Sequence, residues 1–483
     1  MSGWELADRD LKKYPHFDPL IPANEAMELA TDPSRVARHT FYPFMRFTQR
    51  WNRFAGKGEQ GKPKSRQIRY AARRDAYIFS YYRFVLSERY EAELKRLGLS
   101  DSILAYRRIP DSMGDGGKCN IHFARDAFLK IREFRTGCAI ALDISGFFEN
   151  LDHEKLKKLW CRMLDVRKLP PDHFQVFKAI TNYAVVDKQK AYERLGHFGT
   201  KRMTKFGKPV NGYLTPYKKI PKQLCSGKQF RELIVGSGQK KTIIEKNYKP
   251  YGIPQGAPIS DLLANLYLLD FDVVVAGWVG AMGGAYYRYS DDILIVVPGG
   301  EAEGSDIMDR VQKIIGSFGD KLAIKDEKSS AVIFEKNGED QSFRLIRGFQ
   351  GKNGLEYLGF RYDGKRAFIR DSTLSNLNRK IVRAARRAAN ENARRYSDKS
   401  ASEICALFNF EAFTKRFGRI EEFNETEHDY RKWTFWTYAR KASKVFGPLG
   451  SQLLRQLRHI QNFSRNKLNE EFVTAVYRRD NLK

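Results

Sequence analysis

The sequence predicts a large protein of the α/β (α+β) class, and three observations support this prediction. The chain has 483 residues, of which 42% are hydrophobic and 13% aromatic, enough to bury a large core in about three structural units. Short apolar runs typical of strands, at 138–142 and 285–298, lie between segments of helical periodicity. Residues 365–483 have a mainly helical pattern.

The charge balance predicts an anionic partner. Lys and Arg number 86 against 57 Asp and Glu, a net charge of +29. A phosphate backbone is the commonest partner of such a surplus, and a membrane surface is the alternative. No window approaches the roughly 18 apolar residues that span a bilayer, and the first residues lack the basic start and apolar core of a signal peptide. We therefore expect a soluble, cytoplasmic protein that does not act at a membrane.

The five cysteines are far apart, and none of them forms a Cys-x-x-Cys pair. They are Cys119, Cys138, Cys161, Cys225 and Cys405. This pattern argues against a zinc site and against a disulfide framework. We expect all five thiols to be reduced.

The first half of the chain contains two helical regions and one buried strand. Residues 1–60 mix short helical patterns with aromatic residues and are predicted to be an N-terminal helical segment. A basic extended stretch at 62–70 then leads into a long helix over 72–97. The apolar run that ends at Asp143 predicts a buried strand, followed by a turn at Gly146 and a helix with Asp152 as its N-cap.

The second half begins with an unusual segment. Residues 187–249 hold 16 Lys and Arg against 4 Asp and Glu, with little periodicity. They are an inserted basic arm or a solvated loop region, and the length and retained aromatics favour the arm. A glycine-rich stretch at 252–260 precedes a helix over 261–271. Residues 285–298 and 355–362 are each predicted to form a β-hairpin.

Three aspartates at the ends of apolar runs carry the predicted chemistry. Asp291 and Asp292 lie at the bend of the first hairpin, and Asp143 ends the earlier strand. An acid inside an apolar strand costs several kcal/mol unless it is paired or bound to metal, although a surface turn alone would also explain Asp291 and Asp292. Carboxylates from separate strands can hold two Mg²⁺ ions that bridge a triphosphate, a chemistry that uses hard oxygen ligands.

The order of these motifs resembles that of reverse transcriptases, over roughly residues 60–364. The matching motifs are Phe147-Phe148 after Asp143, Gly252-Ile-Pro-Gln-Gly-Ala-Pro-Ile-Ser260, Tyr289-Ser-Asp-Asp292, Lys328, and Leu355-Glu-Tyr-Leu-Gly-Phe360. Ser290 stands where Ala or Met is commoner in that family. One such motif would be weak support, whereas five in order are strong.

The resemblance implies a right-hand polymerase with fingers, a split βαβ palm, and a helical thumb and C-terminal extension. It implies these divisions: an N-terminal segment (1–60), fingers (61–135), palm (136–186 and 250–364), a basic insertion (187–249), and a thumb with a helical C-terminal region (365–483). It assigns Asp143, Asp291, Asp292 and the Ile144 carbonyl to two Mg²⁺ ions, with Mn²⁺ as a substitute. Phe148 matches the steric gate that excludes a 2′-hydroxyl, with a core position as the alternative.

The resemblance also implies nucleotide and primer contacts. Gln255 and Gly256 match the turn that contacts the incoming nucleotide and the template. Lys64, Arg66 and Arg69 lie where the fingers bind the triphosphate, and the sequence does not rank them. Lys328 matches a residue proposed to protonate the leaving pyrophosphate, although an ordinary exposed lysine is nearly as good an interpretation. Leu358 and Gly359 match the primer grip.

The charge outside the motifs predicts a grip on structured RNA. Residues 365–483 hold 26 Lys and Arg against 13 Asp and Glu. At helical spacing, one face would carry Arg379, Arg383, Arg386 and Arg387. Arginine pairs with phosphates and stacks on unpaired bases. A solvated basic face is the alternative.

Within the family, the chain resembles the bacterial defence-associated reverse transcriptases, with type nine favoured over type two. The resemblance rests on Asp143-Ile-Ser-Gly-Phe-Phe-Glu149, the basic stretch before Gly252, and the helical end. It implies synthesis of cDNA from dNTPs on a dedicated non-coding RNA, in phage defence, by a protein that can form homo-oligomers. The alternatives are a template-independent or protein-primed DNA polymerase, an RNA-dependent RNA polymerase, and a non-catalytic RNA-binding scaffold. Primer type and template identity stay open.

Overall fold

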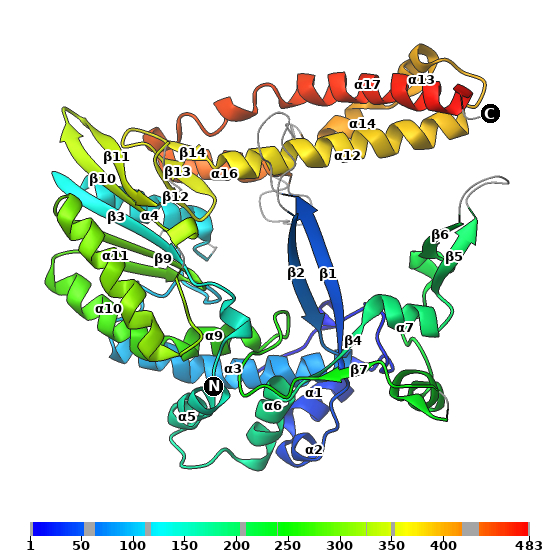
Figure 1. The fold of residues 1–483 in the computed structure, drawn as a ribbon, viewed down its shortest axis with the longest axis horizontal. Coiled ribbons are helices and arrows are strands. Elements are labelled where there is room, and N and C mark those ends of the chain that lie inside the picture. The colour runs from blue at the N-terminus through cyan, green and yellow to red at the C-terminus, as the bar shows by residue number, and fades with distance from the viewer. Residues whose placement is uncertain are drawn as a thin grey trace.

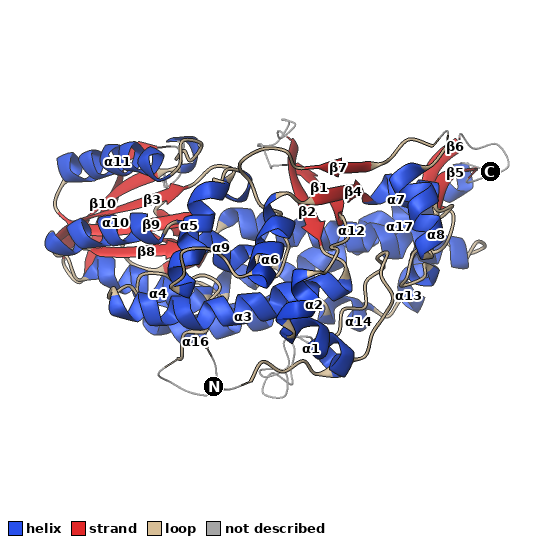
Figure 2. Cartoon of the chain, turned by 90° about the horizontal axis from the view of Figure 1, so that it is seen from below, coloured by secondary structure: helices blue, strands red, loops and turns tan. Residues whose placement is uncertain are grey.

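The computed structural model shows a palm, fingers, an arm and a thumb arranged along an elongated molecule (Figure 1). It describes residues 3–52, 63–111, 117–202, 209–238, 240–324, 326–348, 353–417 and 434–481. The mixture of sheets and helices confirms the predicted α/β class. In both views the palm strands lie at one end and the arm strands at the other (Figures 1 and 2).

The palm is built on a five-stranded sheet in the order β11-β10-β3-β9-β8, and every neighbouring pair is antiparallel. Its strands are β3 (Thr136–Asp143), β8 (Ala285–Tyr289), β9 (Asp292–Pro298), β10 (Ser330–Asn337) and β11 (Asp340–Gly348). The predicted strand before Asp143 and the hairpin around Asp291 are therefore confirmed.

The central strand β3 is apolar from Cys138 to Leu142 because both of its faces are covered there. Side chains alternate between the two faces of a strand. Cys138, Ile140 and Leu142 join one core cluster, and Ala139 joins the other. The first cluster includes residues of α9 (Ser260–Tyr267), α10 (Leu269–Ala281) and α11 (Glu301–Ile315), and the second includes residues of α4 (Asn120–Arg132) and α16 (Phe435–Phe446).

The fingers contain a four-stranded sheet in the order β2-β1-β4-β7. Its strands are β1 (Phe44–Asn52), β2 (Pro63–Tyr70), β4 (Ala184–Asp187) and β7 (Ile244–Lys246). Residues 44–52 thus correct the prediction of a wholly helical segment over 1–60. The basic stretch β2 pairs with β1 along its whole length and supplies its hydrogen bonds, which short-range periodicity does not reveal.

Helices at the base of this sheet share one core with Phe44 and Val185 of the sheet and with the palm. They are α1 (Ala23–Thr31), α2 (Pro33–Ala37), α3 (Arg73–Arg96), α5 (His153–Leu164) and α6 (Pro171–Thr181). Asp152 caps α5 as predicted, because its carboxylate accepts from the Lys155 amide at 2.8 Å. Helix α4 falls in the predicted fingers range, 61–135, and packs on the palm strands β3 and β9. The division at residue 135 stays a prediction.

The basic insertion is an arm with its own small core. It consists of α7 (Lys188–Arg194), β5 (Phe198–Arg202), β6 (Pro209–Tyr213), η3 (Tyr217–Lys219), α8 (Gly227–Gln229) and a π-helical turn, η4 (Phe230–Gly236). Tyr192, Ile220 and Ile234 pack there against Phe17 and Met45. These apolar contacts favour the arm over the solvated loop.

The thumb follows a three-stranded sheet, β12 (Leu355–Tyr357), β13 (Phe360–Tyr362) and β14 (Ala367–Ile369). The predicted hairpin at 355–362 is confirmed. Beyond it lie α12 (Asp371–Arg395), α13 (Ala401–Leu407), α14 (Phe410–Lys415), α16 and α17 (Ile460–Asn481). Helices α12 and α17 pack along each other beyond the end of the β1–β2 ribbon (Figure 1).

In the described ranges, no single helix is long and apolar enough to cross a membrane, although α9 and α10, bent by 49°, reach that length and composition together. Both helices contribute to the main core. All five cysteines are free, as expected from their spacing.

Candidate active site

The three predicted catalytic aspartates lie at neighbouring strand ends. Asp143 ends β3 and is the cross-strand partner of Asp292, the first residue of β9. The Ile144 amide donates to the Asp291 carbonyl at 3.0 Å, which joins the segment after β3 to the hairpin turn. All three aspartates line one cleft of about 500 Å³. The fold therefore brings together residues that are almost 150 positions apart in the sequence.

The turn that carries Asp291 is held in place by the buried side chain of Arg288. Ser290 has φ +62°, an unfavourable conformation for a residue with a Cβ. The Arg288 guanidinium donates to the Ser290 carbonyl at 3.1 Å and forms an ion pair with Asp272 at 2.6 Å. Tyr106 donates to the Ser290 hydroxyl at 3.1 Å, and burial raises the pKa of Tyr106, so this donor stays protonated.

Sequence reasoning missed this anchor. Arg288 interrupts an apolar strand, and Asp272 interrupts an apolar helix. Both side chains are fully buried, and Asn265 also accepts from Arg288 at 3.0 Å. The sequence did contain an indication: a single positive charge in one apolar segment and a single negative charge in another can both be buried if they form an ion pair.

The donor set of the cleft fits hard divalent cations. Three carboxylates on adjoining strand ends, together with the Ile144 carbonyl, offer only oxygen ligands, which Mg²⁺ prefers. Within the described part of the chain, no three His, Cys, Asp or Glu residues are gathered into a metal centre. The metal role of the aspartates stays a prediction. Lys328 lies in η6 (Asp326–Lys328), and its side chain is outside the described residues.

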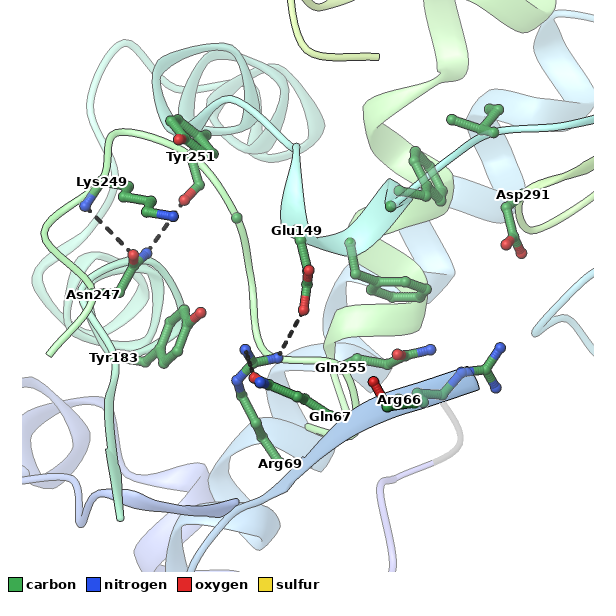
Figure 3. Close-up of a pocket in the computed structure, with 16 residues that line it drawn as sticks. Arg66, Gln67, Arg69, Glu149, Tyr183, Asn247, Lys249, Tyr251, Gln255 and Asp291 are labelled. Atoms are coloured by element: carbon green, nitrogen blue, oxygen red, sulfur yellow. Dashed lines mark hydrogen bonds and ion pairs between the residues drawn. The ribbon is translucent and has the colours of Figure 1, made fainter. Parts of the chain in front are cut away.

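A second hollow, of about 660 Å³, adjoins the aspartate cleft (Figure 3). Arg66 and Asp291 line both hollows. Phe148 and Gln255 also line this one, and their contact with a nucleotide stays a prediction. The neighbouring Phe147 is only 2% exposed and belongs to the core. The two rings meet edge to face, with centroids 5.8 Å apart.

The glycine-rich stretch joins the palm to the fingers. Gly256 has φ +116°, and a Cβ there would lie 2.4 Å from the Arg69 carbonyl oxygen. The Arg69 amide donates to the Gln255 carbonyl at 3.0 Å. Only glycine permits this close approach, so Gly256 sets the position of β2 over the hollow.

The structure distinguishes two of the three basic residues of the fingers, Arg66 and Arg69. Arg69 is buried, and its guanidinium lies 5.6 Å above the Tyr183 ring and 3.5 Å from the Glu149 carboxylate. Its Nε and Nη1 have no hydrogen-bond partner. Arg66 is exposed at the rim, and the side chain of Lys64, on β2, is outside the described residues. Buried donors without acceptors are costly, so Arg69 is the best placed to bind an anion.

The predicted primer grip lies on the opposite wall of the aspartate cleft. Leu358 and Gly359 form the β12–β13 turn, with φ values of +47° and +91°. Asn120 of α4 donates to the Leu358 carbonyl at 3.1 Å. Arg370 pairs with Glu356 at 2.6 Å beside the turn. The turn is thus held against the palm from two sides.

The predicted RNA-binding arginines share α12 but differ in their surroundings. Arg383 and Arg387 are exposed, and Arg379 is half-buried. Arg386 forms a forked ion pair with Glu471 of α17, with a shortest distance of 2.9 Å. Its charge is therefore balanced within the protein, whereas Arg383 and Arg387 face solvent.

The fold and the cleft together define a right-hand polymerase. Residues 178–362 match the model of the family described as reverse transcriptase (RNA-dependent DNA polymerase). Over this part, which is less than half of the chain, the protein is similar to the reverse transcriptase family. The matched range includes Asp291 and Asp292 and begins after Asp143.

Solved telomerase structures also align with the chain. Apo telomerase from Candida tropicalis, truncated from its C-terminal domain, is 12% identical with a TM-score of 0.36, over 63% of this chain and 52% of that chain. The corresponding apo telomerase is 13% identical with a TM-score of 0.35, over 90% and 65%. Telomerase from Candida albicans in complex with a TWJ fragment of telomeric RNA is 11% identical with a TM-score of 0.36, over 92% and 62%. This chain therefore spans less than two thirds of each. No curated protein matches it.

Proposed function

We propose that the protein is an RNA-directed DNA polymerase that extends a primer 3′-hydroxyl with deoxynucleotides along an RNA template. One observation carries the proposal: Asp143 and the Asp291–Asp292 turn line a single cleft that adjoins a nucleotide-sized hollow. The reverse transcriptase match over residues 178–362 supports it.

Each wall of the two hollows has a role in this proposal. Asp143, Asp291, Asp292 and the Ile144 carbonyl would hold two Mg²⁺ ions, or Mn²⁺, which when bound activate the 3′-hydroxyl and stabilise the leaving pyrophosphate. Arg69 binds the triphosphate through its Nε, which has no hydrogen-bond partner, and Gln255 contacts the base pair being formed. Phe148 packs under the sugar and excludes a 2′-hydroxyl. Leu358 and Gly359 position the primer strand, and Lys328 donates a proton to pyrophosphate.

We further propose that the template is a dedicated non-coding RNA, and that the cDNA acts in phage defence in the bacterial cytoplasm, as the sequence resemblance implies. Residues 187–249 and 365–483, outside the catalytic motifs, would hold that RNA. Sequencing of the nucleic acid that co-purifies with the protein tests the template. A single recurrent RNA is expected, and random cellular RNA would contradict the proposal.

The test of catalysis uses Asp291→Ala combined with Asp292→Ala. Incorporation of labelled dNTPs on an RNA template with a DNA primer should require Mg²⁺ and should disappear in the double variant. The exposed acid Asp306 on α11 provides a matched control, since Asp306→Ala removes a carboxylate outside the cleft. Thermal unfolding shows that each variant is folded.

Extension by the folded double variant would show that the aspartates do not catalyse the reaction. Reactions without template or without primer separate the alternatives. Synthesis without template indicates a template-independent enzyme, and product attached to protein indicates a protein primer. An RNA-binding wild type that incorporates nothing would indicate a scaffold.

A further inference from the structure

A third hollow lies outside the catalytic site, between the fingers ribbon and the arm. Its volume is about 450 Å³. It is lined by β1, by the start of α7 and by the β5–β6 hairpin, through Arg46, Phe47, Thr48, Arg50, Asp187, Lys188, Gln189, Tyr192, Phe198 and Tyr213. We call it the arm groove. None of its lining residues lines the aspartate cleft or the nucleotide hollow.

The arm groove gathers aromatic rings around one lysine. The Lys188 ammonium lies 5.0 Å from the ring centre of Tyr217, 5.4 Å from that of Tyr192 and 5.9 Å from that of Phe47. Tyr192 is buried, but Phe47 is 37%, Tyr213 38% and Tyr217 52% exposed. Rings that served only as core would be covered. These rings stay partly exposed beside a cation.

Apart from one ion pair and one helix cap, the charged side chains of the arm groove are basic. Glu245 pairs with Arg46 in a fork at 2.8 and 2.9 Å. Asp187 caps α7 by accepting from the amides of Gln189 and Lys190. Lys188 and the exposed Arg50 remain, and Lys218 and Lys219 are exposed on the adjoining η3. Phosphates complement such a surface.

The arm groove and the nucleotide hollow are lined by the two strands of one ribbon. Residues of β2 from Ser65 to Arg69 line the nucleotide hollow, and residues of β1 from Arg46 to Arg50 line the arm groove. The two strands are paired in register, with Arg46 opposite Arg69 and Gln49 opposite Arg66. Paired strands are only about 5 Å apart. A strand of nucleic acid can therefore pass from one hollow to the other in a few nucleotides.

We propose that the arm groove binds single-stranded RNA, the stretch of template that has not yet been copied. Bases stack on the exposed parts of the Phe47, Tyr213 and Tyr217 rings, and Lys188 and Arg50 contact the phosphates. Aromatic rings in a basic groove bind single strands with little sequence preference, because every base has a flat face. The arm thereby adds a template holder to the fingers. The assignment of this RNA as template rests on the proposed function, whereas the binding of RNA does not.

Binding is measured on the full-length protein with a fluorescent, unstructured RNA of about 12 nucleotides. Phe47→Ala with Tyr213→Ala should weaken binding roughly tenfold or more, the effect of losing at least one stacked base. Lys188→Met, which keeps the packed stem, should weaken it less. The matched control is Phe174→Ala on α6, because Phe174 is 43% exposed with the Lys157 ammonium 5.4 Å from its ring centre and lines none of the three hollows. It should change affinity less than twofold.

Two further measurements place the RNA. Photo-crosslinking with 4-thiouridine RNA should label peptides that contain Phe47 or Tyr213. On primer–templates, the double variant should raise KM for a template with a long single-stranded 5′ extension and leave KM for a one-nucleotide extension unchanged. Phe47→Leu, which preserves apolar contact with Tyr70, replaces Phe47→Ala if the double variant unfolds.

Unchanged RNA affinity together with crosslinks elsewhere would overturn the proposal. An equal rise of KM on both templates with unchanged affinity would also overturn it, because it would show a structural role. If the wild type binds and crosslinks through the groove but makes no DNA, the proposed function fails and the groove remains an RNA site.

Discussion

At the scale of single residues, two adjacent phenylalanines have different tasks. Both border the nucleotide hollow, but Phe147 is a member of the main core and only 2% exposed, whereas Phe148 packs against that core and is half-buried. They sit in the short helix η2 (Phe147–Glu149) after Gly146, whose φ of +59° turns the chain away from β3. Phe148 therefore offers more of its ring to the hollow than Phe147 does.

We predict that Phe148→Ala raises the use of ribonucleotides relative to deoxyribonucleotides by roughly tenfold, about 1.4 kcal/mol. Loss of the ring leaves room for the 2′-hydroxyl. The ratio of kcat/KM values for both substrates on one template measures the effect. Phe147→Ala is the control: it should cost about 3–5 kcal/mol of stability as a core truncation and leave the ratio unchanged. An unaltered ratio for Phe148→Ala would assign that ring to packing.

At the scale of elements, the hairpin β8–β9 is the part of the site under most constraint. Its turn contains Ser290 at positive φ and carries Asp291 and Asp292. Helix α10 supplies Asp272, which accepts from both Arg288 and Tyr286 at 2.7 Å. The palm helix and the hairpin are thus joined by a buried ion pair directly beneath the predicted catalytic turn.

We predict that Arg288→Met destabilises the protein by about 3–5 kcal/mol, because it leaves Asp272 buried without its cation. Adding Asp272→Leu removes the stranded charge and should restore most of that stability. The double variant should nevertheless incorporate nucleotides more slowly, since the Ser290 carbonyl has lost its donor. Urea unfolding and kcat are measured in parallel.

A surface pair offers the control for this experiment. Asp270 pairs with Arg162 at 2.9 Å, and both side chains are 44% exposed. Asp270→Asn should therefore cost less than about 1 kcal/mol. If kcat of the Arg288→Met, Asp272→Leu variant equals that of the wild type, the ion pair has only a structural role.

At the scale of the whole molecule, the surplus of positive charge lies largely outside the catalytic motifs. The arm and the C-terminal helices carry most of the excess, and α12 and α17 extend beyond the fingers ribbon (Figure 1). The two helices pack through Ala385, Ala389 and Phe472, which leaves Arg383 and Arg387 on the exposed side.

We predict that Arg383→Gln with Arg387→Gln weakens binding of a structured RNA and flattens its salt dependence. Two lost phosphate contacts should reduce the slope of log K against log salt by about 1.4 to 1.8. Metal-dependent extension of a short generic primer–template should persist. Filter binding between low and moderate salt measures the slope.

Arg386 and Glu471 provide the matched control because they neutralise each other. Arg386→Gln with Glu471→Gln leaves the net charge unchanged and should leave the slope unchanged. If the Arg383, Arg387 variant keeps the wild-type affinity and slope, these arginines form only a solvated face.

The sequence by itself determined the fold class and the residues from which the cleft is built. Asp143 and the Asp291–Asp292 pair were identified from their places at the ends of apolar runs. The stretch around Gly256 and the Leu358–Gly359 turn were identified from their resemblance to reverse transcriptase motifs. The tertiary structure decided everything that depends on contacts between distant segments. It paired Arg288 with Asp272 and neutralised the charge of Arg386 with that of Glu471. It also buried Arg69, but not Arg66, as the cation that can bind an anion. It also made residues 44–52 a strand by pairing them with β2, and it placed the arm beside this strand so that the two line the arm groove. Charge pairing and burial depend on distances across the fold, and residues far apart in a sequence do not reveal those distances.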